Sequence, residues 1–249
     1  MTAGLNLLAP DLGVSGVGVR VTTRSGGVSA DPYGTLNLAL HVGDSPEAVL
    51  ENRHRLQMAL PNRRFSWLKQ IHGTAVVQGS DSEVPEADAQ WTTEPSLVLA
   101  VLTADCLPVV LAAQDGSCVA LAHAGWRGLA EGVLEALLQR LPVRTEEVIA
   151  WLGPAIGAQA YEVGPEVREA FLTQMGWRCE QSFQVSNRTA GHWMADLYSL
   201  ARHRLERAGV GVVLGGDWCT FSQPGNFFSH RRDGPATGRM ATLVWREVS

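Results

Sequence analysis

The stretch from Leu97 to Ala113 is the longest apolar run in the chain, and Asp105 and Pro108 interrupt it. A membrane-spanning helix needs about 20 nearly uncharged residues, and a proline in its interior breaks the helical hydrogen bonding. Short apolar runs on either side of a polar break are instead typical of buried strands. The stretch therefore predicts two buried strands, at 97–102 and 108–113, and argues against a membrane protein.

Turn and helix signals surround these two strands. Residues 114–116 read Gln-Asp-Gly and predict a hairpin turn into a strand at 118–122. Ser45 before Pro46 predicts the start of a helix, which Pro61 ends. The remaining expected elements are a strand at 17–22, a strand at 65–68, a turn at 125–128, a helix at 129–141, a helix from Pro165, a helix from about 196 to 209, and strands with a Gly-rich loop (229–238) after residue 212.

Hairpin-like strand pairs beside isolated helices indicate an α+β fold with mixed β-sheets flanked by helices. No linker rich in proline, glycine or serine divides the chain, so we expect a single domain over residues 1–249. A doubly wound sheet is the alternative. Neither a G-x-G-x-x-G turn after a strand nor a Walker loop is present, so neither nucleotide-binding fold is indicated.

Charge and cysteine usage restrict the function classes. The net charge of −5 argues against a nucleic-acid binder, because phosphate neutralisation needs a basic face. The four cysteines form no C-x-x-C pair, and residues 1–13 lack the basic segment of a signal peptide. We therefore expect free thiols and a cytoplasmic protein.

Three candidate metal ligands stand at predicted strand ends beside turns: His72, Cys106 and His123. Burying the neighbouring Asp105 is costly unless its carboxylate is bonded, which favours a function for the Asp105-Cys106 pair. Two imidazoles and one thiolate make a three-ligand zinc set that leaves a fourth position for water. Two simpler interpretations stay open: His72 as a half-buried histidine bonded to a backbone carbonyl, and Cys106 as a small core side chain.

Copper is the other metal that this ligand set suits, since blue-copper sites also use two histidines and a cysteine. A multicopper oxidase needs many more imidazoles, and the remaining histidines form no His-x-His pair. We therefore rank zinc above copper.

Arginines beside glycine-rich turns indicate an anion site. His123 is followed by Ala-Gly-Trp-Arg-Gly, and a strand, a turn and a helix start in that order can bind an anion, with Arg127 as a clamp. The simpler interpretation is a tight turn in which Trp126 only packs. The C-terminal loop holds Arg231, and Arg24 lies in a second exposed turn. Asn37 and His41 could line a pocket or cap turns.

Several segments, taken in order, resemble the bacterial laccase-domain family and together span about residues 20 to 245. They are Thr22-Thr23-Arg24-Ser25-Gly26-Gly27-Val28-Ser29, Leu36-Asn37-Leu38 with His41-Val42-Gly43-Asp44, Gln70-Ile71-His72-Gly73, Thr103-Ala104-Asp105-Cys106-Leu107-Pro108, His123-Ala124-Gly125-Trp126-Arg127-Gly128, Gly153-Pro154-Ala155-Ile156-Gly157, and Arg231-Arg232-Asp233 with Thr237-Gly238-Arg239. The family was first described as multicopper polyphenol oxidoreductase. The chain departs from the family pattern at His230, where tyrosine is usual, at Ala39, where glycine is common, and in a loop one residue longer around 235–236.

The resemblance implies a zinc-dependent purine nucleoside phosphorylase with adenosine deaminase and methylthioadenosine phosphorylase activities, acting on adenosine, inosine and related nucleosides with phosphate. It places the metal on His72, Cys106 and His123. Asp105 joins these three as a catalytic candidate, in the role of a proton shuttle. The substrate-binding candidates are Arg24, Asn37, Gln70, Arg127, Ser229 and Arg231, with Arg127 and either Arg24 or Arg231 on the phosphate.

Three other functions stay open. The family is also linked to peptidoglycan-precursor editing, for which Cys106 and a histidine would form a thiolate–imidazolium hydrolase pair. A copper polyphenol oxidase is the second. The third is a non-enzymatic structural zinc module, which would need a closed site with four ligands, whereas three are evident.

Overall fold

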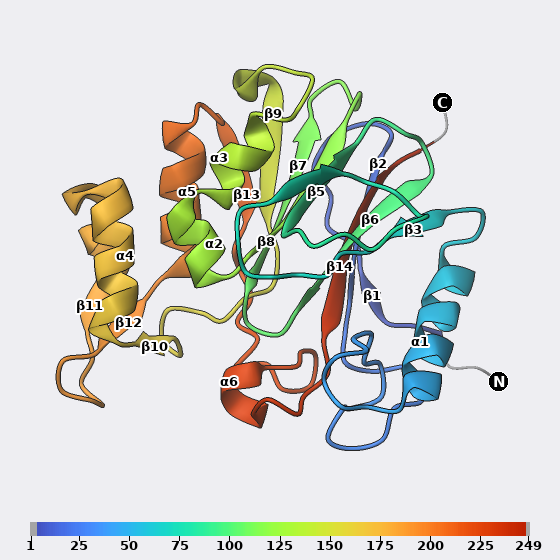
Figure 1. Ribbon diagram of the computed structural model, residues 1–249, viewed down its shortest axis with the longest axis horizontal. Coiled ribbons are helices and arrows are strands. Elements are labelled where there is room, and N and C mark those ends of the chain that lie inside the picture. The colour runs from blue at the N-terminus through green and yellow to red at the C-terminus, as the bar shows by residue number, and fades with distance from the viewer. Residues whose placement is uncertain (1–3, 248–249) are drawn as a thin grey trace.

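The computed structural model describes residues 4–247 and is shown in Figure 1. Its elements in chain order are β1 (Leu7–Leu8), β2 (Val17–Thr22), α1 (Pro46–Ala59), β3 (Arg64–Ser66), β4 (Val76–Gln78), β5 (Ala89–Thr92), β6 (Leu97–Thr103), β7 (Leu107–Ala113), β8 (Val119–Ala124), α2 (Trp126–Glu131), α3 (Val133–Leu138), η1 (Thr145–Glu147), β9 (Val148–Leu152), β10 (Glu162–Val163), α4 (Pro165–Met175), η2 (Trp177–Ser182), β11 (Phe183–Val185), β12 (Trp193–Ala195), α5 (Leu197–Arg207), β13 (Val212–Gly215), α6 (His230–Asp233) and β14 (Met240–Arg246).

Two large mixed sheets lie at the centre of the fold. The five-stranded sheet has the order β1-β2-β14-β6-β3, and the six-stranded sheet has the order β13-β9-β7-β8-β5-β4. Most neighbouring strands are antiparallel, but β3 with β6, β4 with β5, and β13 with β9 are parallel. A small third sheet, β10-β12-β11, lies beside α4 (Figure 1). The predicted single α+β domain with mixed sheets is confirmed.

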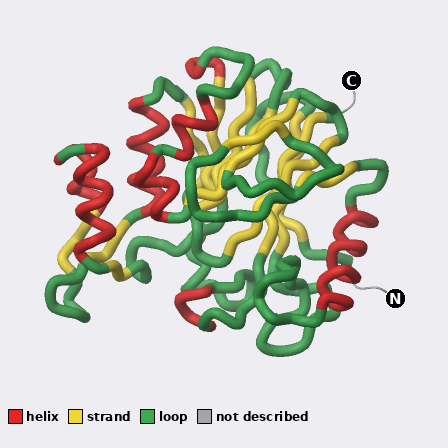
Figure 2. Tube along the Cα trace, viewed as in Figure 1, coloured by secondary structure: helices red, strands yellow, loops and turns green. Residues whose placement is uncertain are grey.

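The two large sheets pack face to face. Helix α1 and the loop at 36–39 cover the outer face of the five-stranded sheet, and further helices cover that of the six-stranded sheet (Figure 2). Leu99 and Val101 of β6 share one apolar cluster with Val110 of β7, whereas Val98 of β6 joins Leu56 of α1 in another. The other face of the six-stranded sheet packs on α2, α3 and α5. Because β6 and β7 are buried on both faces, their sequences are continuously apolar rather than alternating.

Local signals account for most helix and turn boundaries. The Ser45 side chain accepts a hydrogen bond from the Ala48 N–H at 3.3 Å, which caps α1, and α4 begins at Pro165 as predicted. The predicted hairpin joins β7 to β8 through a backbone bond from the Ala113 N–H to the Cys118 carbonyl, at 3.0 Å.

The predicted helix at 129–141 is wrong in both its start and its continuity. Helix α2 already begins at Trp126, so residues 125–128 are its cap and first turn rather than a separate turn. Gly132, with a φ of 100°, then separates α2 from α3. This left-handed backbone favours glycine, which explains the break. Within residues 4–247, no helix combines the length and apolar character needed to cross a bilayer.

Candidate metal centre and its cavity

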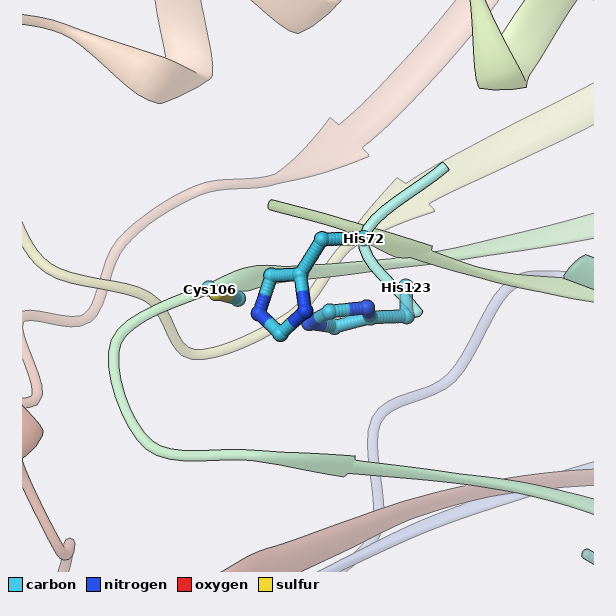
Figure 3. Close-up of side chains that lie close together, drawn as sticks. All are labelled: His72, Cys106 and His123. Carbon is cyan, nitrogen blue, oxygen red and sulfur yellow. The ribbon is translucent and has the colours of Figure 1, made fainter. Parts of the chain in front are cut away.

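The structure brings His72, Cys106 and His123 together. Their ligand atoms all lie within 4.8 Å of one another, and the two imidazole rings meet edge to face (Figure 3). Cys106 lies in the loop from β6 to β7, and His123 lies on β8 opposite Pro108. The β7–β8 hairpin therefore places the cysteine beside a histidine that is distant in sequence.

Asp88 holds both histidines in place. Its fully buried carboxylate accepts hydrogen bonds from the backbone N–H groups of Ile71, His72 and Gly73, at 3.2, 2.9 and 2.7 Å. Its Oδ1 also lies 2.8 Å from Nδ1 of His123. His72 has a φ of 60°, a left-handed conformation that costs energy outside glycine, and the bonds to Asp88 stabilise it. Asp88 thus orients one ligand through its backbone and the other through its ring.

Two glycines let α2 approach these ligands closely. A Cβ at Gly125 would lie 3.0 Å from Cδ2 of His72 and 3.3 Å from Sγ of Cys106. A Cβ at Gly128 would lie only 2.5 Å from the Gly73 carbonyl oxygen. The Gly-x-x-Gly spacing in this segment is therefore a packing requirement of the site.

The electrostatics of the ligand group favour a thiolate. Burial alone raises the pKa of Cys106, but the positive charge and hydrogen bond of His123 outweigh it, and the pKa falls to about 6. Burial likewise lowers the pKa of His123, whereas the Cys106 thiolate and Asp88 raise it to about 9. At a pH between these two values, Cys106 and His123 of the metal-free protein therefore favour a thiolate–imidazolium pair.

This donor set fits a metal ion. With Nδ1 of His123 directed at Asp88, Nε2 is the nitrogen left for a metal, and a carboxylate behind a ligating histidine is a common support in metal sites. A thiolate, which is the form that ligates metals, is already favoured at Cys106. His72, Cys106 and His123 would hold the ion, and a bound zinc ion would supply Lewis-acid chemistry.

Asp105 holds two other segments against its own loop beside the cavity. It has a φ of 91°, and its carboxylate accepts hydrogen bonds from the Thr220 hydroxyl at 2.6 Å, the Ser229 hydroxyl at 3.0 Å and the Arg231 backbone N–H at 2.7 Å. These hydrogen bonds offset the free-energy cost of burying the Asp105 carboxylate. These three hydrogen bonds engage both carboxylate oxygens. The role of Asp105 as a proton shuttle stays a prediction.

The ligand group opens into a cavity of about 380 Å³, a size typical of small-molecule sites. The residues that line it include His41, Gln70, Asp105, Trp126, Arg127, Ile156, Tyr161, His230, Arg231 and Arg239, together with the three ligands. A second hollow of about 380 Å³ adjoins it and shares Trp126, Arg127, Tyr161 and Arg231 as a common wall. Burial raises the pKa of the Tyr161 phenol, so it stays neutral and can donate a hydrogen bond.

Three of the predicted substrate-binding residues line this cavity: Gln70, Arg127 and Arg231. Gln70 bonds the backbone of Leu102 through both ends of its amide, at 2.8 Å each, so its side chain also fixes the end of β6.

The other three predicted substrate-binding residues are not among those that line the cavity. Arg24 bonds the Pro224 carbonyl and lies over the Phe228 ring. Asn37 is buried in a network with Asp44 and the Arg239 backbone, and Ser229 caps α6 while donating to Asp105.

The sequence interpretation missed two site residues, Asp88 and Tyr161. A signal for Asp88 existed, because it stands between two alanines at the start of a strand and its charge needs partners once buried. Tyr161 precedes a short strand and carried no signal of its own.

A family model described as multi-copper polyphenol oxidoreductase laccase matches residues 18–247. A purine nucleoside phosphorylase of Pseudomonas aeruginosa is 51% identical over 225 residues, which are 90% of this chain and 91% of that protein. The purine nucleoside phosphorylase YfiH of Escherichia coli is 47% identical over 234 residues, which are 92% of this chain and 94% of YfiH.

Solved structures agree over nearly the whole chain. The Neisseria meningitidis protein NMB0706 superposes with a TM-score of 0.93 at 46% identity, covering 98% of this chain and 100% of that one. YlmD from Geobacillus stearothermophilus superposes with a TM-score of 0.83 at 31% identity, covering 94% of this chain and 93% of YlmD.

Proposed function

Because the chain belongs to the multi-copper polyphenol oxidoreductase laccase family, and its curated relatives are named purine nucleoside phosphorylases, we propose that it is a purine nucleoside phosphorylase. The reaction would convert adenosine, inosine and related nucleosides with phosphate into the free base and ribose 1-phosphate. The observation that carries the proposal is the cavity in which the metal-ligand group meets several cationic side chains.

The chemistry of phosphorolysis matches the composition of this cavity. A phosphate oxygen bonds to the ribose anomeric carbon while the bond from that carbon to the purine nitrogen breaks, through a transition state with oxocarbenium character. The protein must hold an anion, stabilise charge and deliver a proton to the departing base. Arg127, Arg231 and Arg239 supply positive charge, and the neutral Tyr161 phenol, on the same wall as Arg127, can donate a hydrogen bond to the departing base.

We propose zinc at the three-ligand site, with copper as the weaker candidate, because two imidazoles and one thiolate with an open fourth position suit catalytic zinc. Adenosine deamination and methylthioadenosine phosphorolysis are proposed as further activities of the same cavity. A cytoplasmic location remains the proposal for a chain whose four cysteines are free.

The test combines metal analysis with product analysis. The protein, purified without a metal-affinity tag, is assayed for zinc and copper and incubated with adenosine or inosine, with and without phosphate. We expect about one zinc per chain and free base only when phosphate is present. Inosine formed from adenosine without phosphate would report deamination. Cys106→Ala should lose the metal and the phosphorolysis, whereas the matched Cys118→Ala, in the apolar core, should keep both. Phosphorolysis by metal-free Cys106→Ala at the wild-type rate would refute the site.

A second candidate rests on the chain of contacts from Cys106 through His123 to Asp88. A thiolate, an imidazole and a carboxylate in that order can perform nucleophilic hydrolysis. We infer that the same groups could serve a peptidoglycan-precursor editing hydrolase. Cleavage of a muropeptide by chelator-treated protein that produces no purine would favour this candidate. Oxygen uptake with a phenol and stoichiometric copper would instead favour a polyphenol oxidase.

A further inference from the structure

Arg239, the residue before β14, presents a fixed guanidinium at the cavity. Its backbone N–H donates to Oδ1 of the buried Asn37 at 3.0 Å, which ties the loop to the segment that leads to His41. Its Nη1 donates to the carbonyls of Thr237 and Gly238, at 2.6 and 3.1 Å. The side chain is therefore held in one orientation before any ligand binds, which reduces the entropy cost of binding.

No acidic side chain in the described part of the chain forms an ion pair with this guanidinium. Among residues 4–247, the ion pairs do not include Arg239. The negative groups that face it are Cys106, a proposed metal ligand, and Asp105. Both Asp105 oxygens already accept hydrogen bonds from other residues. His41 also lies near Arg239, and burial together with the positive charge of Arg239 lowers the pKa of its imidazole, so His41 supplies no negative charge to the guanidinium.

Burial makes the lack of an ion pair at Arg239 energetically important. The Arg239 side chain is only partly exposed, and burial lowers the pKa of its guanidinium, which means that the charged form is poorly solvated. A cation withdrawn from water needs an anion or several hydrogen-bond acceptors to offset the lost hydration. At Arg239 the fixed acceptors are two backbone carbonyls, and both bind the same nitrogen.

The free edge of the guanidinium has the geometry of an oxyanion receptor. Nε and Nη2 make no hydrogen bond within the described part of the chain, yet neither is among its enclosed, unsatisfied atoms, so both stay accessible. Together they form the side of the guanidinium that binds two oxygens of one phosphate or carboxylate. His41 lines the same cavity and lies close enough to sense the charge of Arg239.

The arginines on the other wall differ from Arg239. Both Arg127 and Arg231 are exposed. The Arg127 guanidinium stacks on the neighbouring Trp126 ring at 4.3 Å, and Nη1 of Arg231 donates to the Glu162 carbonyl at 2.6 Å. They also line the second hollow, so they belong to the wall that the two hollows share.

We propose that Arg239, with His41 beside it, is the subsite for the inorganic phosphate that attacks the nucleoside, in place of the expected Arg127. The inference rests on the proposed phosphorolysis for the identity of the ligand. It leaves Arg127 and Arg231, on the wall shared by the two hollows, to contact the nucleoside.

The test measures phosphate binding directly, by isothermal titration of the metal-loaded protein with inorganic phosphate. Arg239→Gln removes the charge and the bidentate edge, and should weaken phosphate binding by about 10–100-fold, the loss expected for hydrogen bonds to a charged group. Arg239→Lys keeps the charge without the fork and should fall between. Arg127→Gln should keep phosphate affinity within about twofold, as should Arg20→Gln, a control on β2 outside the cavity. In turnover, Arg239→Gln should raise the KM for phosphate far more than that for the nucleoside.

Circular dichroism and thermal unfolding of each variant separate binding loss from unfolding, and Arg239→Lys carries the test if Arg239→Gln does not fold. Unchanged phosphate affinity in a folded Arg239 variant, or a large loss in Arg127→Gln alone, would overturn the subsite. Formation of ribose 1-phosphate with an unaffected Arg239 variant would leave the proposed function intact. Phosphate binding that depends on Arg239, without any ribose 1-phosphate, would keep the subsite and refute phosphorolysis.

Discussion

Replacing Asp88 with asparagine tests how the ligand group is held. Every group that the Asp88 carboxylate binds is a donor: three backbone N–H groups, and the Nδ1–H of His123 when its Nε2 ligates the metal. Oδ1 serves His72 and His123, and Oδ2 serves Ile71 and Gly73. An asparagine keeps one oxygen as an acceptor and replaces the other with an amide NH2 group, which is a donor. Whichever way the amide points, two buried donors then face another donor.

The size of the effect follows from this arrangement. A buried donor without an acceptor costs about 1–3 kcal/mol, so two such donors should lower the free energy of unfolding by about 2–4 kcal/mol after partial relaxation. Losing the support behind a ligating histidine typically weakens metal binding about 10–100-fold, or about 1.4–2.7 kcal/mol. We therefore expect Asp88→Asn to fold less stably and to release zinc more readily than the wild type.

Competition with a zinc chelator measures the metal affinity, and denaturant unfolding of the metal-free protein measures stability separately. Asp44→Asn is the matched control, because Asp44 also accepts hydrogen bonds from several donors, including Ser29 and Asn37, but touches no ligand. It should leave zinc affinity unchanged. A folded Asp88→Asn protein that holds zinc as tightly as the wild type would refute the reasoning.

Three further substitutions or titrations probe the same region. In metal-free protein, alkylation of Cys106 should reach its plateau above a pKa of about 6, because the charge of its histidine neighbour outweighs burial; an inflection near 9 would contradict the thiolate. Gly128→Ala should lower the melting temperature, because its Cβ would lie 2.5 Å from the Gly73 carbonyl, and overpacking costs about 1–3 kcal/mol; an unchanged melting curve would argue against the close approach. Asp105→Asn should retain zinc but lose activity by displacing Arg231, and loss of zinc in that variant would show that the two are linked.

Elements with local signals were predictable from the sequence, and those set by tertiary contacts were not. Capping at Ser45 and the turn before Cys118 depend on neighbouring residues alone. The break at Gly132 does not follow from the apolar pattern, because residues on both sides of it face the same core. The first turn of α2 packs closely on Gly73 through Gly128, a contact between distant segments that the local sequence pattern does not contain.

The candidate site divides in the same way. His72, Cys106 and His123 could be nominated by chemistry, since few other side chains bind metals and each stands at a predicted strand end. Arg24 and Asn37 were nominated from the same type of turn as the true lining residues, yet they bind other parts of the loops. Which polar residue of a loop reaches a cavity depends on the packing of whole segments, and the sequence pattern does not encode it locally.

Two buried carboxylates explain why the cavity has two chemically different halves. Asp88 accepts bonds from the residues that carry the two histidines, whereas Asp105 accepts bonds from the segments that carry Thr220 and Arg231. The two networks share no hydrogen-bond partner, and Cys106 stands between them, next to Asp105 in the chain and paired electrostatically with His123. Substitutions at sites without shared partners are closer to additive than substitutions at sites in contact. A substitution in the Asp105 network can therefore alter the proposed contacts with phosphate and nucleoside while the candidate metal ligands held by Asp88 stay in place.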